Sequence, residues 1–179
     1  MLRLLNSYTN LNKREKALLS VAYGCGLRRS EIHNLNTNDV NLYKGTLIVR
    51  KGKGNKSRTI PLSDAVISHL KDHLIDERSD YFSSDAKESS QAFFIGVMGK
   101  RMRGEALNNN LKKIVTRTGN DELERKRITL HSLRHSIATH LIDKGADIEF
   151  VQRFLGHSMI DTAHLYAKRR KQKIMNQVF

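Results

Sequence analysis

Apolar residues recur every three to four positions along several stretches of the chain, and this spacing predicts amphipathic helices. In residues 12–22, Ala17 and Val21 fall on one helical face. Asn12 and Glu15 have the spacing of a capping box, which indicates where this helix begins. Further helices are predicted over residues 29–35, 64–75, 105–118, 131–144 and 147–155. A last helix is predicted to begin near residues 158–161, to include residue 166 and to run into residues 168–171.

The pattern changes between residues 40 and 61, where strand-forming residues replace the helical spacing. Strands are predicted over residues 40–42, 46–50 and 57–61, and a basic turn with Gly52 and Gly54 joins the last two. Residues 79–91 and 119–127 are predicted loops because polar residues dominate them. The expected fold class is α+β: a mainly α-helical domain with a small three-stranded antiparallel sheet.

The composition is that of a globular protein. With 179 residues, 39% hydrophobic and 28% charged, the chain is most simply one domain with a buried core. It has neither an apolar run long enough for a membrane span nor the apolar core of a signal peptide, so we expect a cytoplasmic location and no membrane partner. The single cysteine, Cys25, has apolar neighbours and is expected to be a small buried hydrophobic residue rather than a nucleophile.

The net charge of +14 is spread over the whole chain, which indicates a folded surface that faces a polyanion. Charge alone does not distinguish DNA from RNA or from an anionic membrane. Aromatic residues make up only 6% and tryptophan is absent from the sequence, so few side chains are available to stack on the bases of a single strand. Contact with the backbone of a duplex is therefore the favoured interpretation.

A basic motif near residue 131 is suited to phosphate chemistry. His131 and Arg134 are three positions apart on a predicted helix and share a face, whereas His135 is expected to point elsewhere. An arginine offers a planar fork of donors for two phosphate oxygens, and a neighbouring histidine exchanges a proton near neutral pH. Taken alone, these residues fit a solvated basic helix face about as well.

Four more residues have both a chemical and an ordinary interpretation. Arg28 either binds a phosphate or forms a surface pair with Glu31. Lys53, in the basic turn, either contacts the DNA backbone or acts as a mobile general acid. His157 is either a phosphate ligand or a turn histidine. Tyr166 is either a core residue or a nucleophile, and the second role requires cationic neighbours or a base because its free pKa is roughly 10.

In their joint order these motifs resemble the catalytic domain of tyrosine site-specific recombinases, the group that includes phage integrases and Xer-type resolvases. The matching motifs are G-L-R-R-S-E at residues 26–31, G-K-G-N-K at 52–56, H-S-L-R-H at 131–135, L-G-H-S at 155–158 and the tyrosine at 166. The resemblance extends from about residue 10 to residue 170, and six separated positions agree.

The resemblance implies DNA strand cleavage and rejoining through a covalent 3′-phosphotyrosyl intermediate, with neither a metal nor another cofactor. The implied catalytic residues are Arg28 and Arg134 as a clamp on the scissile phosphate, Tyr166 as the nucleophile, Lys53 as the proton donor to the leaving 5′ oxygen, His131 as general acid/base, and His157 as a hydrogen-bond donor to the phosphate. Further contacts with DNA are expected from Arg29, Lys51, Lys56, Arg58 and His135.

The implied partners are double-stranded DNA and other recombinase protomers, assembled as a tetramer on DNA. Residues 174–179 are expected to dock on a neighbouring protomer or on their own domain. Members of the family usually carry an N-terminal core-binding domain, and barely ten residues precede the first predicted helix here. We interpret residues 1–179 as a catalytic domain excised from such a protein, with a naturally short relative as the alternative.

Three other functions share parts of this pattern. A type IB topoisomerase or a telomere resolvase uses related chemistry, but the L-G-H-S motif and the compact spacing favour the recombinase. A DNA-binding accessory protein has no need for Tyr166 together with both arginines and the lysine. The choice among integration, resolution, transposition and inversion stays open, as does the target sequence, because base contacts depend on docked geometry.

Overall fold

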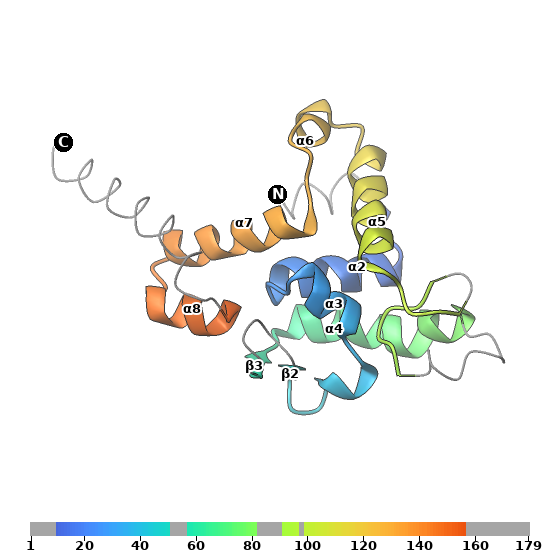
Figure 1. The fold of residues 1–179 in the computed structure, drawn as a ribbon, viewed down its shortest axis with the longest axis horizontal. Helices are drawn as coiled ribbons and strands as arrows, with labels where there is room; N and C mark the ends of the chain where they lie inside the picture. Colours follow the sequence, from blue (N-terminus) through green and yellow to red (C-terminus); the bar gives the residue numbers. More distant parts are fainter. Residues whose placement is uncertain (1–9, 51–56, 82–90, 97–98, 157–179) are drawn as a thin grey trace, which may run out of the picture.

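The structure, a computed structural model, describes residues 10–50, 57–81, 91–96 and 99–156. Helices dominate it, together with one small sheet, which confirms the predicted α+β class (Figure 1). The α-helices are α2 (Lys13–Leu19), α3 (Arg29–Asn34), α4 (Asp64–Asp72), α5 (Gly104–Arg117), α6 (Asp121–Arg125), α7 (Leu130–Asp143) and α8 (Ile148–Leu155). Short π and 3-10 segments are η1 (Ser20–Gly24), η2 (Thr37–Asp39), η3 (His73–Glu77) and η4 (Arg78–Tyr81).

The sheet has the predicted three antiparallel strands in the order β1, β2, β3. They are β1 (Val40–Asn41), β2 (Thr46–Val49) and β3 (Arg58–Pro61). Leu47 pairs with Ile60 and both side chains are fully buried, while Ile48 is 37% exposed on the opposite face. This alternation places one face of the sheet on the core, as strand geometry requires.

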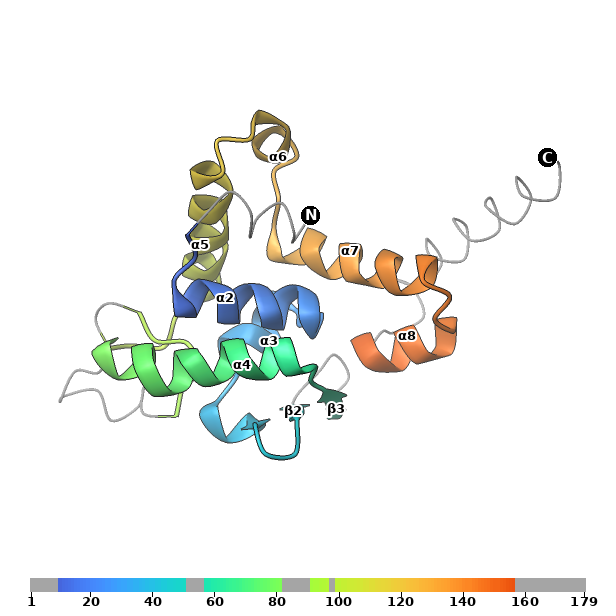
Figure 2. The same ribbon diagram turned by 180° about the vertical axis from the view of Figure 1, so that it is seen from behind.

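One hydrophobic core joins α2, α3, α4, α5 and the sheet, and a smaller cluster joins α7 to α8. Leu18, Ile32, Leu70 and Leu111 are buried in the main core. Seen from behind, α2 and α4 lie side by side and α8 lies close to β3 (Figure 2). Phe154 of α8 packs against both clusters, so it fastens the α7–α8 pair to the rest of the molecule.

The predicted start of the first helix is confirmed. The Asn12 side chain accepts a hydrogen bond from the backbone N–H of Glu15 at 2.9 Å, and the Glu15 carboxylate accepts one from the N–H of Asn12 at 3.1 Å. Both α2 and α4 then continue into π turns, η1 and η3, which the helical spacing alone did not predict. Gly145 and Gly156, which directly follow the predicted helices over residues 131–144 and 147–155, both have positive φ.

The prediction of a loop over residues 119–127 is wrong, because the segment contains α6. The Asn120 side chain caps this helix by accepting hydrogen bonds from the N–H groups of Glu122 and Leu123. Acidic residues in its first turn interact favourably with the positive end of the helix dipole and so stabilise the helix. Leu123 is buried and anchors the short helix. This helix was not predicted from the sequence because the segment is largely polar.

The predicted last helix, with Tyr166, lies outside the described residues. Among the residues that the structure does describe, no helix is long and apolar enough to cross a membrane.

Candidate active site

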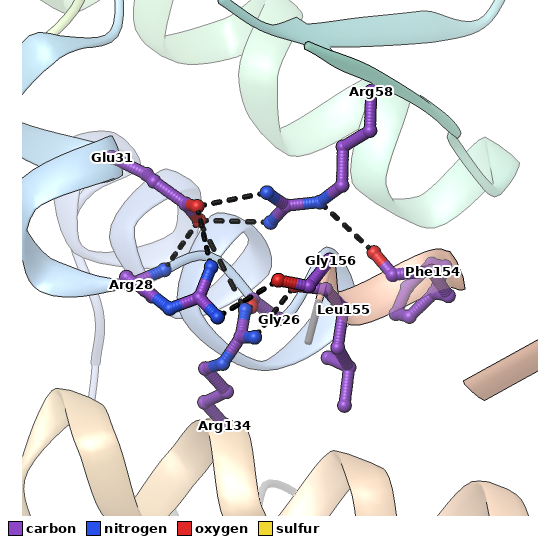
Figure 3. Close-up of polar contacts among 8 residues, drawn as sticks. All are labelled: Gly26, Arg28, Glu31, Arg58, Arg134, Phe154, Leu155 and Gly156. Carbon is purple, nitrogen blue, oxygen red and sulfur yellow. Dashed lines mark hydrogen bonds and ion pairs between the residues drawn. The ribbon is translucent and has the colours of Figure 1, made fainter. Parts of the chain in front are cut away.

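The carboxylate of Glu31 is the centre of a buried polar cluster. Glu31 is in the first turn of α3, and its Oε2 accepts a hydrogen bond from the backbone N–H of Arg28 at 2.8 Å, which closes the start of the helix. Its side chain is only 2% exposed. A charge this deeply buried requires partners, and three arginines provide them (Figure 3).

The three arginines come from three different elements. Arg28 precedes α3 and its Nη1 donates to Glu31 Oε1 at 3.0 Å. Arg58 opens β3 and donates to both carboxylate oxygens, from Nη1 and Nη2, each at 2.8 Å. Arg134 lies on α7, and its Nη1 is 4.0 Å from Glu31 Oε2. Three guanidinium groups face one carboxylate, so positive charge is in excess and favours an anion at this place.

Arg134 is buried although it lies on a helix rich in polar residues. Leu130, Leu133 and Ile137 are buried on the same helix, so the inner face of α7 carries Arg134 into the protein. Its Nη2 donates to the carbonyl oxygen of Leu155 at 2.6 Å, and its Nη1 donates to that of Gly26. The arginine is therefore held in place before any ligand arrives.

The last turn of α8 completes the site. The carbonyl oxygen of Gly156 accepts a hydrogen bond from Arg28 Nη2 at 2.9 Å. Gly156 has a φ of +61°, and a Cβ atom at this position would lie 2.9 Å from Nη1 of Arg58. Glycine is therefore required here both by the backbone conformation and by the close approach of Arg58.

Electrostatics favour the ionised form of Glu31. Burial by itself would raise the pKa of this carboxyl group, but the hydrogen bonds and charge of Arg58, with Arg28 and Arg134, hold it below its usual range. Burial raises the pKa of the neighbouring Cys25 thiol to about 12. The expectation that Cys25 is a small buried residue is confirmed, and a raised thiol pKa disfavours the reactive thiolate.

The two histidines of α7 lie together at its exposed side. Nε2 of His131 is 2.7 Å from Nε2 of His135, with the rings edge to face. The expectation that His135 points away from His131 is therefore wrong, because positions four apart share a helical face as positions three apart do. Among the described residues, no three His, Cys, Asp or Glu side chains gather as a metal-binding group.

The structure brings together Arg28 and Arg134 of the predicted catalytic residues. Arg29, predicted to contact DNA, is exposed at the start of α3. The remaining predicted residues lie outside the described part of the chain: Lys51, Lys53, Lys56, His157 and Tyr166.

Sequence reasoning missed the role of Glu31. Its spacing from Arg28 had an ordinary explanation as a surface pair, which the burial of Glu31 rules out. The capping-box spacing was the available signal, but nothing in the sequence shows that Arg58 reaches the same carboxylate.

Comparison with known proteins gives a consistent result. The family model of the phage integrase family matches residues 1–173. The tyrosine recombinase XerD of Staphylococcus epidermidis is 38% identical over 165 residues, which are 92% of this chain and 53% of XerD. The chain thus spans about half the length of this relative.

Two solved structures have the same fold. The crystal structure of XerA recombinase aligns with a TM-score of 0.78 and 26% identity, over 97% of this chain and 62% of XerA. The XerH site-specific recombinase, in a post-cleavage complex with its palindromic difH substrate, aligns with a TM-score of 0.74 and 27% identity, over 99% of this chain and 49% of XerH.

Proposed function

Because the chain belongs to the phage integrase family, we propose that it cleaves and rejoins double-stranded DNA in site-specific recombination. The observation that carries the proposal is the convergence of Arg28 and Arg134, from distant parts of the chain, on one buried carboxylate. Two guanidinium groups at one place offer paired donors for the non-bridging oxygens of a phosphodiester.

In the proposed reaction the hydroxyl oxygen of Tyr166 attacks the scissile phosphorus. The bond from phosphorus to the 5′ oxygen breaks, and a 3′-phosphotyrosyl ester forms. Lys53 gives a proton to the leaving 5′ oxygen, His131 exchanges protons as general acid/base, and His157 donates a hydrogen bond to the phosphate. Rejoining reverses these steps when the 5′ hydroxyl of another strand attacks, so the phosphodiester bond energy is retained without a cofactor.

The roles of Arg28 and Arg134 in this scheme are electrostatic. Negative charge grows on the non-bridging oxygens as phosphorus becomes pentacoordinate, and donors already held in place stabilise it without reorganisation. Loss of either guanidinium is expected to lower the cleavage rate by about 10²–10³-fold.

The proposed partners are duplex DNA and further copies of the same recombinase. The XerH relative has been solved bound to its difH substrate, which supports DNA as the ligand. Exchange of both strands between two duplexes requires four active sites, hence a tetramer on DNA, in which residues 174–179 would dock on a neighbouring protomer. The reaction is expected to take place in the cytoplasm, where bacterial or phage DNA is accessible.

Two alternatives differ in what they do with DNA. A type IB topoisomerase would relax supercoiled DNA without joining new partners. A non-catalytic accessory protein would bind DNA without forming a covalent bond. The buried arginine pair favours an enzyme, because contact with a DNA backbone alone is served equally well by exposed basic side chains.

The first test is covalent capture on a nicked DNA substrate, in which the short strand released by cleavage diffuses away and rejoining fails. The chain and its Tyr166→Phe variant are incubated with this DNA, denatured in detergent and resolved by size. We expect an adduct with the unmodified chain alone, while both proteins bind the DNA with similar affinity.

An adduct that persists in Tyr166→Phe would assign the nucleophile elsewhere. If neither protein forms an adduct, the same experiment is repeated with an N-terminal core-binding domain joined to the chain. Continued absence of an adduct would then favour the accessory protein.

A further inference from the structure

Arg58 is bound on all sides by protein. Its Nη1 and Nη2 each donate to one oxygen of Glu31, and its Nε donates to the carbonyl oxygen of Phe154 at 3.1 Å (Figure 3). The side chain is only 11% exposed. Both terminal nitrogens of Arg58 are used in a bidentate ion pair with Glu31, whereas Arg28 gives this carboxylate one terminal nitrogen and Arg134 lies 4.0 Å from it. The charge of Arg58 is therefore already matched within the protein.

The geometry points to Arg58 as a positioning residue for the proposed strand cleavage, one that acts through Glu31 and the end of α8 without touching DNA. This inference rests on the proposed function and assigns Arg58 a role other than the DNA contact expected from its place in a basic segment.

The first line of support is the arrangement at the end of α8. Its last carbonyl groups have no partners within the helix, and here three successive ones accept from three arginines. The acceptors are Phe154 from Arg58 at 3.1 Å, Leu155 from Arg134 at 2.6 Å, and Gly156 from Arg28 at 2.9 Å. Cations at this end of a helix also interact favourably with its dipole.

The second line of support is the sharing of Glu31. Arg58 donates to both carboxylate oxygens, while the guanidinium of Arg28 donates to one of them and that of Arg134 lies 4.0 Å away, so Arg58 is the main partner of this charge. Without Arg58, the buried carboxylate would depend on Arg28 for its charge, and Arg28 would be held more tightly away from a phosphate. Arg58 thus sets how much of the positive charge remains for the substrate.

The fork of an arginine is essential to this role. Three donors reach three acceptors on two elements, β3 to α3 and β3 to α8, which the single ammonium group of lysine does not reproduce. Arg58→Lys keeps the charge and loses the geometry, whereas Arg58→Met keeps the approximate shape and loses both.

The test separates positioning from DNA contact. DNA affinity is measured over a range of salt concentrations, and the rate of phosphotyrosyl adduct formation is measured at saturating DNA. We expect Arg58→Lys and Arg58→Met to lower the rate of adduct formation at saturating DNA by about 10–100-fold. Removing a side chain that orients a reactive residue typically has an effect of this size. The salt dependence of binding should stay unchanged.

Arg29→Met is the control variant, because Arg29 is exposed and is expected to contact a DNA phosphate. Loss of such a contact reduces the slope of log affinity against log salt by about one. If Arg58→Met shows the same reduced slope and recovers its rate at high DNA concentration, Arg58 is a DNA contact and the inference is overturned.

A neutral substrate distinguishes positioning from a general loss of structure. Replacing one non-bridging oxygen of the scissile phosphate with a methyl group removes the charge that Arg28 and Arg134 would neutralise. A defect that acts through these arginines should shrink on this methylphosphonate DNA. An equal defect of Arg58→Lys on both substrates would contradict the inference.

Hydrogen exchange provides an outcome that does not depend on cleavage. Residues 151–156 should exchange several-fold faster in Arg58→Lys than in the unmodified chain, because the end of α8 loses an anchor. If no adduct forms even with an N-terminal core-binding domain joined to the chain, the proposed function fails while this measurement still decides whether Arg58 holds α8. Unchanged exchange would overturn the positioning role even if cleavage is observed.

Discussion

Gly156 combines two constraints in one residue. Its φ of +61° is in the left-handed region, and the space that a side chain would need is occupied by Arg58. Gly119 has nearly the same backbone conformation, with a φ of +60°, but nothing lies within 4 Å of the position where its Cβ would be. The two glycines therefore form a matched pair that separates backbone strain from collision with the site.

We expect Gly119→Ala to lower stability by about 1 kcal/mol through backbone strain alone and to leave cleavage unchanged. Gly156→Ala carries the same strain and also displaces Arg58, so it should lose more stability and most of the cleavage rate. Thermal unfolding and adduct formation measure the two effects. Equal behaviour of the two variants would show that the contact between Gly156 and Arg58 is unimportant.

Among the elements, the π turn η3 buries a histidine that responds to acid. His73 is fully buried against Phe93 and Phe94, and its Nε2 donates to the carbonyl oxygen of Phe93 at 3.2 Å. Burial lowers the pKa of His73 to about 4. The charges of Arg14 and Arg78 lower this pKa further, and the hydrogen bond to Phe93 partly offsets the decrease. The neutral ring is therefore the form that the folded protein keeps.

Acid should destabilise the protein over a defined range. As pH falls from about 6.5 to about 4, the unfolded chain binds a proton at His73 and the folded protein does not, so the free energy of unfolding decreases. Below about pH 4 both states are protonated and this contribution levels off, after a loss of about 3 kcal/mol.

The measurement is denaturant unfolding across this pH range for the unmodified chain and for His73→Gln. The amide of glutamine can donate to the carbonyl of Phe93 but does not titrate. We expect the variant to be less stable at neutral pH, because ring packing is lost, and to show a flatter pH dependence. Parallel curves for the two proteins would assign the acid sensitivity to other groups.

Across the whole molecule, the net charge of +14 predicts how binding of the proposed DNA substrate depends on salt. Neutralising six or more phosphates releases counterions, so affinity for duplex DNA should fall by about 10³-fold or more between about 50 and 200 mM salt. Fluorescence anisotropy with labelled duplex and single-stranded DNA measures this dependence. Tight binding that salt leaves unaffected would mean that contacts other than phosphates dominate.

The elements were predictable to the extent that each carries its own signal. The strand near Leu47 alternates buried and exposed residues, and Asn12 and Glu15 cap their helix locally, so both follow from short-range sequence. The helix α6 was missed because one buried leucine, Leu123, gives no periodicity, although Asn120 is a recognisable cap. Spacing along the chain predicts local structure and leaves these short or irregular segments undetermined.

The site was predictable only as a set of residue types. Arg28 and Arg134 were expected together, and their convergence follows from the packing of α7 against η1. Glu31 of α3 pairs with Arg58 of β3, which lies 27 positions later in the chain. The spacing of apolar and polar residues along the sequence does not predict a contact of this kind. Long-range polar partners depend on how elements pack, which is why Arg58 was expected at the surface.

The bonds that fasten α8 to the site have a consequence for biosynthesis. They join residues 128 and 96 positions apart, so they are among the last that a growing chain can form. During synthesis Arg28 and Arg58 are made well before α8, while the protein lengthens at the ribosome. A nascent or truncated chain that stops before Gly156 therefore carries much of the basic charge without the assembled arginine cluster, and the proposed cleavage has to wait until residue 156 has been made.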